Sequence, residues 1–145
     1  MSGWPELKWD TEPTGPLKGL KIVDMSTVVL GPFATLNFAD MGADVIKIEN
    51  DEGKFGGDMM RHAGDNPTGD LGPIFTALNR NKKSITLNGK NENDKAVILE
   101  LLKHADVFFH NVRLAGMERL GLDYESVKAI NPGIVYVHCA GFGQG

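Results

Sequence analysis

Two basic side chains of this 145-residue chain stand a few positions beyond short apolar runs. Lys90 follows the run that ends at Leu87, and Arg119 lies downstream of the run 107–109, as does Asn111. An ammonium group pairs with phosphate oxygens as a point charge, and a guanidinium group binds them as a two-pronged fork. Because parallel sheets bind ligands where their strands end, a sheet that brings these side chains to one edge would form a site for a phosphorylated ligand.

The stretch 26–31 is a second candidate for anion binding. It joins an apolar run to a helix-like segment, and free backbone N–H groups at such a junction attract negative charge. A dinucleotide-binding fold would place the pattern G-x-G-x-x-G there, whereas the sequence has a single Gly31 followed by Pro32. The P-loop pattern G-x-x-x-x-G-K-[ST] is also missing, and the glycine-rich stretch 53–57 is a weak signal alone. The sequence therefore disfavours an NAD-dependent oxidoreductase and a P-loop phosphotransferase.

The remaining polar residues form no visible catalytic constellation. The histidines and carboxylates lack the spacing of metal ligands or of a catalytic triad, so we predict neither a metal site nor a catalytic residue in this chain. The single cysteine, Cys139, lies in an apolar run and is expected to pack as a small hydrophobic side chain. The residues considered are His62, His104, His110, His138, Asp24, Asp40, Asp44, Glu49 and Asp58.

Composition limits the class of protein. Hydrophobic residues make up 41% of the chain and charged residues 23%, which is typical of one globular domain. The formal net charge of -4 argues against nucleic-acid binding, which depends on a basic surface. One cysteine favours a reducing compartment. The sequence shows no signal-peptide pattern and no apolar run of about 20 residues, so we expect a cytoplasmic protein outside the membrane.

The apolar pattern predicts the elements that must position these side chains. Short apolar runs flanked by turn residues predict strands, and apolar residues at helical spacing predict helices. Asn93 and Asp94 are expected to cap the clearest helix, which reaches His104. The predicted strands cover 20–25, 43–48, 84–87, 107–109 and 134–139, and the predicted helices cover 31–41, 74–78, 93–104 and 124–130.

This alternation of strands and helices predicts an α/β fold. Strands that are apolar without polar alternation are covered on both faces, so we expect a doubly wound, mostly parallel sheet. Residues 1–15 are expected to form a leader, residues 16–145 one domain, and the stretch 50–72 a long loop.

Several segments, taken in order, resemble the family III CoA-transferases, a superfamily that includes formyl-CoA and carnitine CoA-transferases and the alpha-methylacyl-CoA racemases. Segment 39–49 is similar to the family's A-D-x-G-A-D-V-I-K-[IV]-E, and segment 57–61 to its G-D-x-x-R. Further similar segments are 16–24, G-P-F at 31–33, N-R-N-K-[KR]-S at 79–84, A-D-V at 105–107, R-L-G at 119–121, N-P at 131–132 and G-F-G-Q at 141–144.

The resemblance implies a fold, a ligand and a set of contacts. The chain would be the N-terminal part of the family's large domain, a Rossmann-like domain that binds the nucleotide end of CoA and is cut at its C-terminal end. CoA or an acyl-CoA would be a substrate, a carboxylic acid the second substrate, and no cofactor would be tightly bound. The contacts with CoA would come from Val28, Val29, Leu30, Leu87, Lys90, Asn111, Val112 and Arg119.

The resemblance also assigns roles to these contacts. Backbone groups of residues 28–30 would hold the adenine end, and Lys90 and Arg119 would bind phosphate oxygens. Two departures from the family imply weaker adenine stacking: Asn50 stands where some members have an arginine, and Val112 where an aromatic residue is common.

The activity implied by the resemblance is acyl transfer through an acyl intermediate on an aspartate that lies beyond Gly145. This chain alone would then be inactive, and the full-length protein would be an interlocked homodimer. Two alternatives stay open: an acyl-CoA racemase, which exchanges the proton alpha to the thioester, and a non-catalytic CoA-binding module that stands alone.

Overall fold

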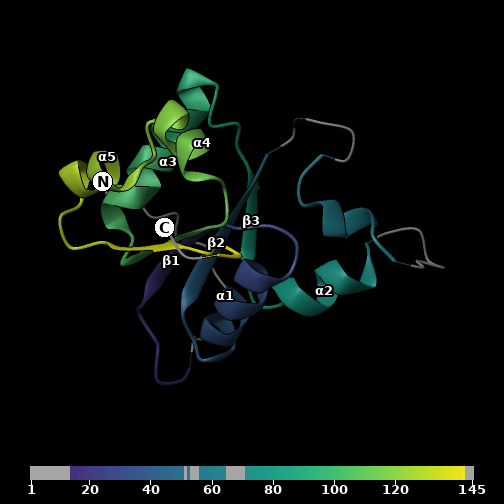
Figure 1. Cartoon of the computed structure of the whole chain (residues 1–145). Helices are drawn as coiled ribbons and strands as arrows, with labels where there is room; N and C mark the ends of the chain where they lie inside the picture. The colour runs from purple at the N-terminus through teal and green to yellow at the C-terminus, as the bar shows by residue number, and fades with distance from the viewer. Residues whose placement is uncertain (1–13, 51, 53–55, 65–70, 143–145) are drawn as a thin grey trace.

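The computed structural model describes residues 14–50, 52, 56–64 and 71–142. In this part of the chain, the strands form one five-stranded sheet in the order β3-β2-β1-β4-β5, and every neighbouring pair is parallel (Figure 1). The α/β, Rossmann-like fold is therefore confirmed. The strands are β1 (Lys21–Met25), β2 (Asp44–Glu49), β3 (Lys83–Thr86), β4 (Val107–His110) and β5 (Val135–His138). The helices are α1 (Leu30–Asp40), the 3-10 helix η1 (Met59–His62), α2 (Pro73–Asn79), α3 (Glu92–His104), α4 (Leu114–Leu120) and α5 (Tyr124–Ile130).

Strand β1 lies at the centre of the sheet, and the chain moves outward from it in both directions. It passes first to β2 and β3 at one edge and then returns to β4 and β5 on the other side of β1. The register pairs Met25 with His110 where β1 and β4 end. The carboxyl ends of β1 and β4 thus form the point at which strand order reverses, where open α/β sheets bind their ligands.

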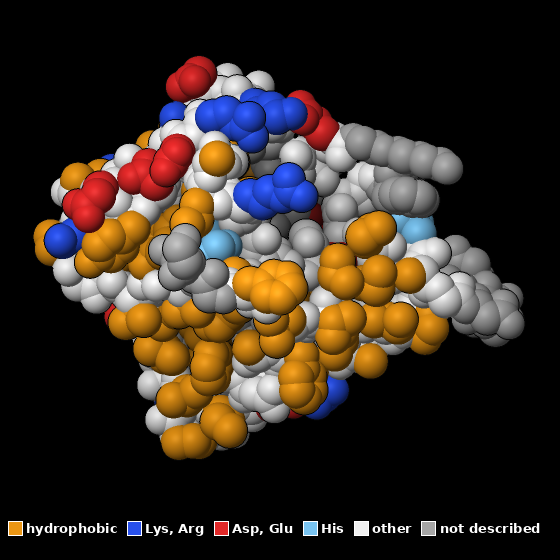
Figure 2. All heavy atoms as spheres, viewed as in Figure 1, with side chains coloured by type: hydrophobic (Ala, Val, Ile, Leu, Met, Phe, Trp, Pro, Cys, Tyr) orange, Lys and Arg blue, Asp and Glu red, His pale blue; other side chains and the backbone are white. Residues whose placement is uncertain are grey.

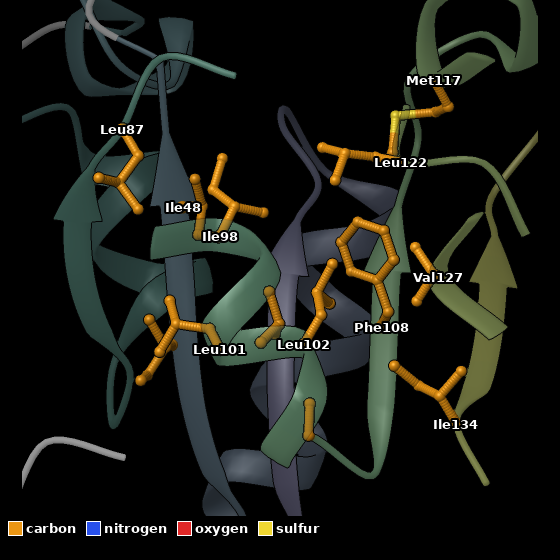
Figure 3. Close-up of a cluster of buried hydrophobic side chains, with 13 residues drawn as sticks. Ile48, Leu87, Ile98, Leu101, Leu102, Phe108, Met117, Leu122, Val127 and Ile134 are labelled. Atoms are coloured by element: carbon orange, nitrogen blue, oxygen red, sulfur yellow. The ribbon is translucent and has the colours of Figure 1, made fainter. Parts of the chain in front are cut away.

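Helices cover both faces of the sheet. Figure 1 shows α3, α4 and α5 on one side and α1 and α2 on the other. On the first side, Leu101 and Leu102 of α3 pack with Phe108 of β4 in the larger apolar cluster (Figure 3). Burial of each such side chain contributes about 1.5–3 kcal/mol. On the second side, a smaller cluster joins Ile22 and Val45 to α1.

The structure corrects several predicted boundaries. The cap of α3 is Asn91 and not Asn93 or Asp94, because the side-chain oxygen of Asn91 accepts hydrogen bonds from the N–H groups of both. The carboxylate of Asp94 is used elsewhere, as it accepts from the N–H of Asn88 (2.9 Å). Helices α4 and η1 were not predicted, and α1 begins at Leu30, earlier than expected.

The described residues include no helix that is long and apolar enough to cross a membrane. Residues 1–13 of the predicted leader lie outside the described residues. Just after them, the N–H of Leu17 donates to the carbonyl of Met41 (3.0 Å), which fastens the approach to β1 onto the end of α1.

Candidate functional site

The turn between β1 and α1 lies at the point where strand order reverses. Asn111, which directly follows β4, holds this turn from the neighbouring strand. Its side-chain oxygen accepts from the N–H of Thr27 (3.0 Å), and its side-chain nitrogen donates to the carbonyl of Thr27 (2.9 Å). Both ends of the Asn111 amide are therefore engaged in joining β4 to the turn.

Val28 gives this turn an unusual backbone conformation. Its φ is +72°, in the left-handed region that β-branched residues rarely adopt. The next residue, Val29, is the N-cap of α1 and makes no side-chain capping bond. The start of α1 therefore presents the positive end of a helix dipole, beside the exposed side chains of Val29 and Leu30. Such a surface suits a ligand that is partly apolar and partly anionic.

Gly31 allows the turn to fold back on itself. A Cβ placed on Gly31 would lie 2.3 Å from the Cβ of Ser26, a distance that two side chains cannot share. The close approach of the end of β1 to the first turn of α1 therefore requires glycine at this position.

A layer of buried charges lies beneath the turn, and its first pair is Lys47 with Asp58. The Nζ of Lys47 lies 3.0 Å from Oδ2 of Asp58, and both side chains are buried. Lys47 also donates to the carbonyl of Ser26 (2.6 Å). Asp58 accepts from the N–H of Val28 at 3.2 and 3.3 Å and from the N–H of Met60 at 3.0 Å. The pair thus connects β2 and the loop after it to the turn.

Glu49 and Arg61 form the second pair of this layer. The guanidinium group of Arg61 binds both carboxylate oxygens of Glu49, at 2.7 and 2.6 Å. Ser84 (2.5 Å) and the N–H of Asp58 (2.9 Å) donate to the same carboxylate. Although burial alone would raise it, these hydrogen bonds hold the pKa of Glu49 at about 2. Glu49 is therefore an anion at neutral pH and fixes the loop that carries Asp58.

Lys82 and Asp24 form the third pair, on the α1 side of the turn. The Nζ of Lys82 donates to Asp24 (3.2 Å), to the carbonyl of Pro32 (2.9 Å) and to the side chain of Asn79 (2.9 Å). The hydroxyl of Thr35, on α1, donates to the same oxygen, Oδ2 of Asp24 (2.5 Å). Burial lowers the pKa of Lys82 to about 8, against the opposing effect of Asp24.

The three pairs balance one another, with a cation for each anion. Each of the carboxylates has at least one basic partner at hydrogen-bond distance. Sequence reasoning found no partner for Asp24, Glu49 or Asp58. The spacing within a segment gives no signal of these partners, because each pair joins charged residues of two different segments. This layer holds the turn and leaves no carboxylate of the three spare for acid–base chemistry.

Lys90 and Arg119 lie on neighbouring segments that follow the carboxyl ends of β3 and β4. Lys90 stands between β3 and α3 and pairs with Glu52 at 2.5 Å. A Cβ placed on Gly89 would lie 3.5 Å from Cδ2 of Leu120, so the turn that carries Lys90 packs against the end of α4 that carries Arg119. Figure 2 shows Lys and Arg side chains gathered near the top of the view, where α3 and α4 lie in Figure 1. Their contact with CoA stays a prediction.

Leu87 and Val112 contribute to the core. Leu87 is buried in the larger apolar cluster, and Val112 packs against that cluster. The N–H of Leu87 donates to the carbonyl of Glu49 (2.9 Å), which extends the pairing of β2 with β3. Their predicted contacts with CoA also stay predictions, and for Leu87 such a contact would have to use the backbone.

His110 and His138 stack on each other, although their sequence positions suggested no pairing. They are register partners on β4 and β5, with ring centroids 4.8 Å apart and an angle of 17° between the planes. Burial, with a smaller effect of His138, lowers the pKa of His110 to about 4, so its ring is neutral at pH 7. Among the described residues, no group of three or more His, Cys, Asp or Glu side chains is arranged to hold a metal ion.

Cys139 follows β5 and does not lie within it. Its N–H donates to the carbonyl of His110 (2.8 Å), and its side chain is half-buried. Burial, supported by the charge of Asp24, raises the pKa of the Cys139 thiol. The thiol is therefore a weak nucleophile at neutral pH.

Comparison with known proteins gives a consistent result. The model of the family described as CoA-transferase family III matches residues 17–145. The chain is 44% identical to an acyl-CoA transferase of Fusarium pseudograminearum, over 90% of this chain and 30% of that protein. It is 43% identical to the acetyl-CoA:oxalate CoA-transferase of Acetobacter aceti, over 92% of this chain and 33% of that protein. A crystal structure of a CAIB/BAIF family protein from Brucella suis matches with a TM-score of 0.77 and 39% identity, over 85% of this chain and 32% of that one. The chain therefore spans about a third of the length of the curated relatives it matches.

Proposed function

Since the chain belongs to CoA-transferase family III, we propose that it binds the nucleotide end of CoA in a protein that moves CoA from an acyl-CoA donor to a carboxylic acid. The observation that carries this proposal is the edge formed by the β1–α1 turn, the turn of Lys90 and the end of α4. This edge lies where an open α/β sheet binds ligands, and it combines exposed apolar side chains with cations suited to phosphates.

The roles of individual residues follow from their places in the structure. Lys90 and Arg119 would bind phosphate oxygens, since both side chains are exposed at the same edge. The start of α1, with the backbone of Val29 and Leu30, would hold the adenine end. Asn111 and Val28 would act mainly by shaping the turn, because the Asn111 amide and the Val28 N–H already have protein partners.

The chemical step would need a nucleophilic carboxylate. We propose that it comes from a residue outside the part of the chain that the structure describes. In the reaction that we propose for the whole protein, an aspartate attacks the thioester carbonyl, an anhydride forms and the CoA thiolate leaves. The CoA thiolate then attacks the aspartyl carbonyl of this anhydride, which releases the donor as a carboxylate and leaves CoA as a thioester of the aspartate. The acceptor carboxylate attacks that thioester and displaces the CoA thiolate, which attacks the acceptor carbonyl of the new anhydride. CoA thus ends as the thioester of the acceptor, and the aspartate is freed. Asp24, Glu49 and Asp58 are unsuited to this attack because each is buried and ion-paired.

Two other activities would use the same CoA site. A racemase would exchange the proton alpha to the thioester, and a stand-alone module would bind CoA without catalysis. The names of the relatives above favour transfer. Incubation of the whole protein with an acyl-CoA in heavy water separates the options, because a racemase incorporates deuterium at the alpha carbon whereas a transferase passes CoA to an added carboxylic acid.

We further propose that the full-length protein is an interlocked cytoplasmic homodimer. Large apolar side chains are exposed near β5, including Val135 (57% exposed) and Phe142 (92% exposed). Exposed apolar groups of this kind commonly mark surfaces that other protein segments cover. Light scattering of the full-length protein would measure its mass, and a monomer would contradict the proposal.

Calorimetric titration of coenzyme A into this chain tests the proposed site directly. We expect Lys90→Ala and Arg119→Ala each to weaken binding by about tenfold, as expected for the loss of a charged phosphate contact. Lys103→Ala is a matched control, because Lys103 is an exposed lysine on the last turn of α3 that pairs with Glu100. Equal affinity of all four proteins, or no binding by a folded wild-type chain, would contradict the proposed site.

A further inference from the structure

We propose that Asp58 is a positioning residue that holds the β1–α1 turn in its binding conformation, with Lys47 as its anchor. This inference rests on the proposed function, because CoA is the ligand that the turn is proposed to bind. Asp58 touches neither the adenine nor the phosphates in this proposal. It acts through the backbone of Val28, whose N–H it holds.

The turn needs an external support because its conformation is unfavourable. Val28 has a φ of +72°, and a valine in this region is strained by its branched side chain. Strained backbone of this kind persists only where the surrounding structure fixes it, and it is found preferentially at functional sites. A glycine would adopt the same φ freely.

Asp58 and Lys47 supply this support from two directions. Both carboxylate oxygens of Asp58 accept a hydrogen bond from the N–H of Val28. Lys47 donates a hydrogen bond to the carbonyl of Ser26, two residues before Val28 (2.6 Å). The two side chains are joined at 3.0 Å and are 1% and 0% exposed. A buried ion pair adds little net stability compared with apolar residues of the same size. Its specific contribution here is to fix the positions of two backbone groups of one turn.

The position of Asp58 is itself fixed by Glu49. The N–H of Asp58 donates to Oε2 of Glu49 (2.9 Å), and Arg61 holds that carboxylate in two places. The support therefore runs from β2 through the loop after it to Val28. Because Asp58 occupies the N–H of Val28, the N–H groups left for a ligand are those at the start of α1, whose direction the turn sets.

The experiment compares coenzyme A binding with the state of the Val28 amide in the full 145-residue chain. Titration calorimetry measures affinity, and NMR-detected hydrogen exchange measures protection of the Val28 N–H. We expect Asp58→Asn to weaken CoA binding by about tenfold and to speed exchange at Val28. Asp40→Asn is the matched control, because Asp40 makes an exposed ion pair with Arg80 at the far end of α1; we expect it to change neither quantity.

A second substitution separates positioning from a general loss of structure. Adding Val28→Gly to Asp58→Asn supplies a residue that tolerates positive φ without support, so we expect it to recover most of the lost affinity. A merely structural role of Asp58 would not be rescued by a glycine at another position. If Asp58→Asn does not fold, the pair Lys47→Met/Asp58→Leu removes both charges together, and the same glycine is tested in that background.

The outcomes distinguish this inference from the proposed function. Absence of CoA binding by the folded wild-type chain would overturn the proposed function and, with it, the binding role of Asp58. Wild-type binding with undiminished affinity in Asp58→Asn, despite fast exchange at Val28, would overturn the inference alone. Failure of Val28→Gly to recover any affinity would also overturn it.

Discussion

Lys90 carries a charge that already has a partner at the proposed phosphate site. Its ammonium group lies 2.5 Å from Glu52, and Asn88 donates to the same carboxylate (2.8 Å). The hydrogen bond from Lys90 lowers the pKa of Glu52, so this carboxylate is an anion at neutral pH. A phosphate group of CoA would have to displace Glu52 and would also be repelled by it.

We therefore expect Glu52→Gln to strengthen CoA binding by about two- to fivefold, the range typical of an exposed ion pair. The gain should shrink at high salt, because surface charges are screened. Titration calorimetry at low and high salt measures both effects. Glu100→Gln serves as the control, since Glu100 is also exposed and bound to a lysine but lies on α3 beside Lys103. Weaker binding by Glu52→Gln would show that Glu52 supports the site and does not compete for it.

At the level of elements, sequence pattern predicts the parts of this fold that are built from apolar runs. Each strand was predicted within a few residues, because buried apolar residues mark β1, β2 and β4, and turn residues flank β3, which is largely exposed. Helix α4 was missed because it is short and contains Gly116, which weakens a helical pattern. The buried ion pairs were missed because each joins two segments, and a single sequence does not show which charged residues meet.

The capping of α3 provides a test at this scale. Asn91 accepts from two N–H groups of the first turn, whereas the predicted caps do not fill this role. We expect Asn91→Ala to lower the free energy of unfolding by about 1 kcal/mol. Asn93→Ala should change it by only a few tenths of a kcal/mol, since Asn93 is exposed. Urea unfolding followed by circular dichroism measures both values, and a larger loss in Asn93→Ala would restore the original prediction.

The whole molecule has two unlike faces. One side of the sheet packs against α3, α4 and α5 through apolar side chains, and the other carries the buried ion pairs above the smaller cluster of Ile22 and Val45. The apolar side could be predicted from hydrophobic periodicity alone. The charged side could not, because its stability depends on exact partners and on protonation. The two faces should therefore respond differently to pH.

The dependence of stability on acid follows from Glu49. Its pKa is about 2 in the folded chain and 4.5 as the ordinary value, so between these values the unfolded chain binds more protons than the folded one. Stability from Glu49 is thus fully present above pH 4.5 and is lost as the pH falls toward 2, by about 3 kcal/mol in total. Urea unfolding at several pH values measures this slope.

We expect Glu49→Gln to be less stable at pH 7 and to lose less on acidification, so that the two curves converge near pH 2. Glu100→Gln, which alters an exposed pair, should keep the wild-type slope. Parallel curves for wild type and Glu49→Gln would mean that the charge of Glu49 does not hold the loop and β2 together.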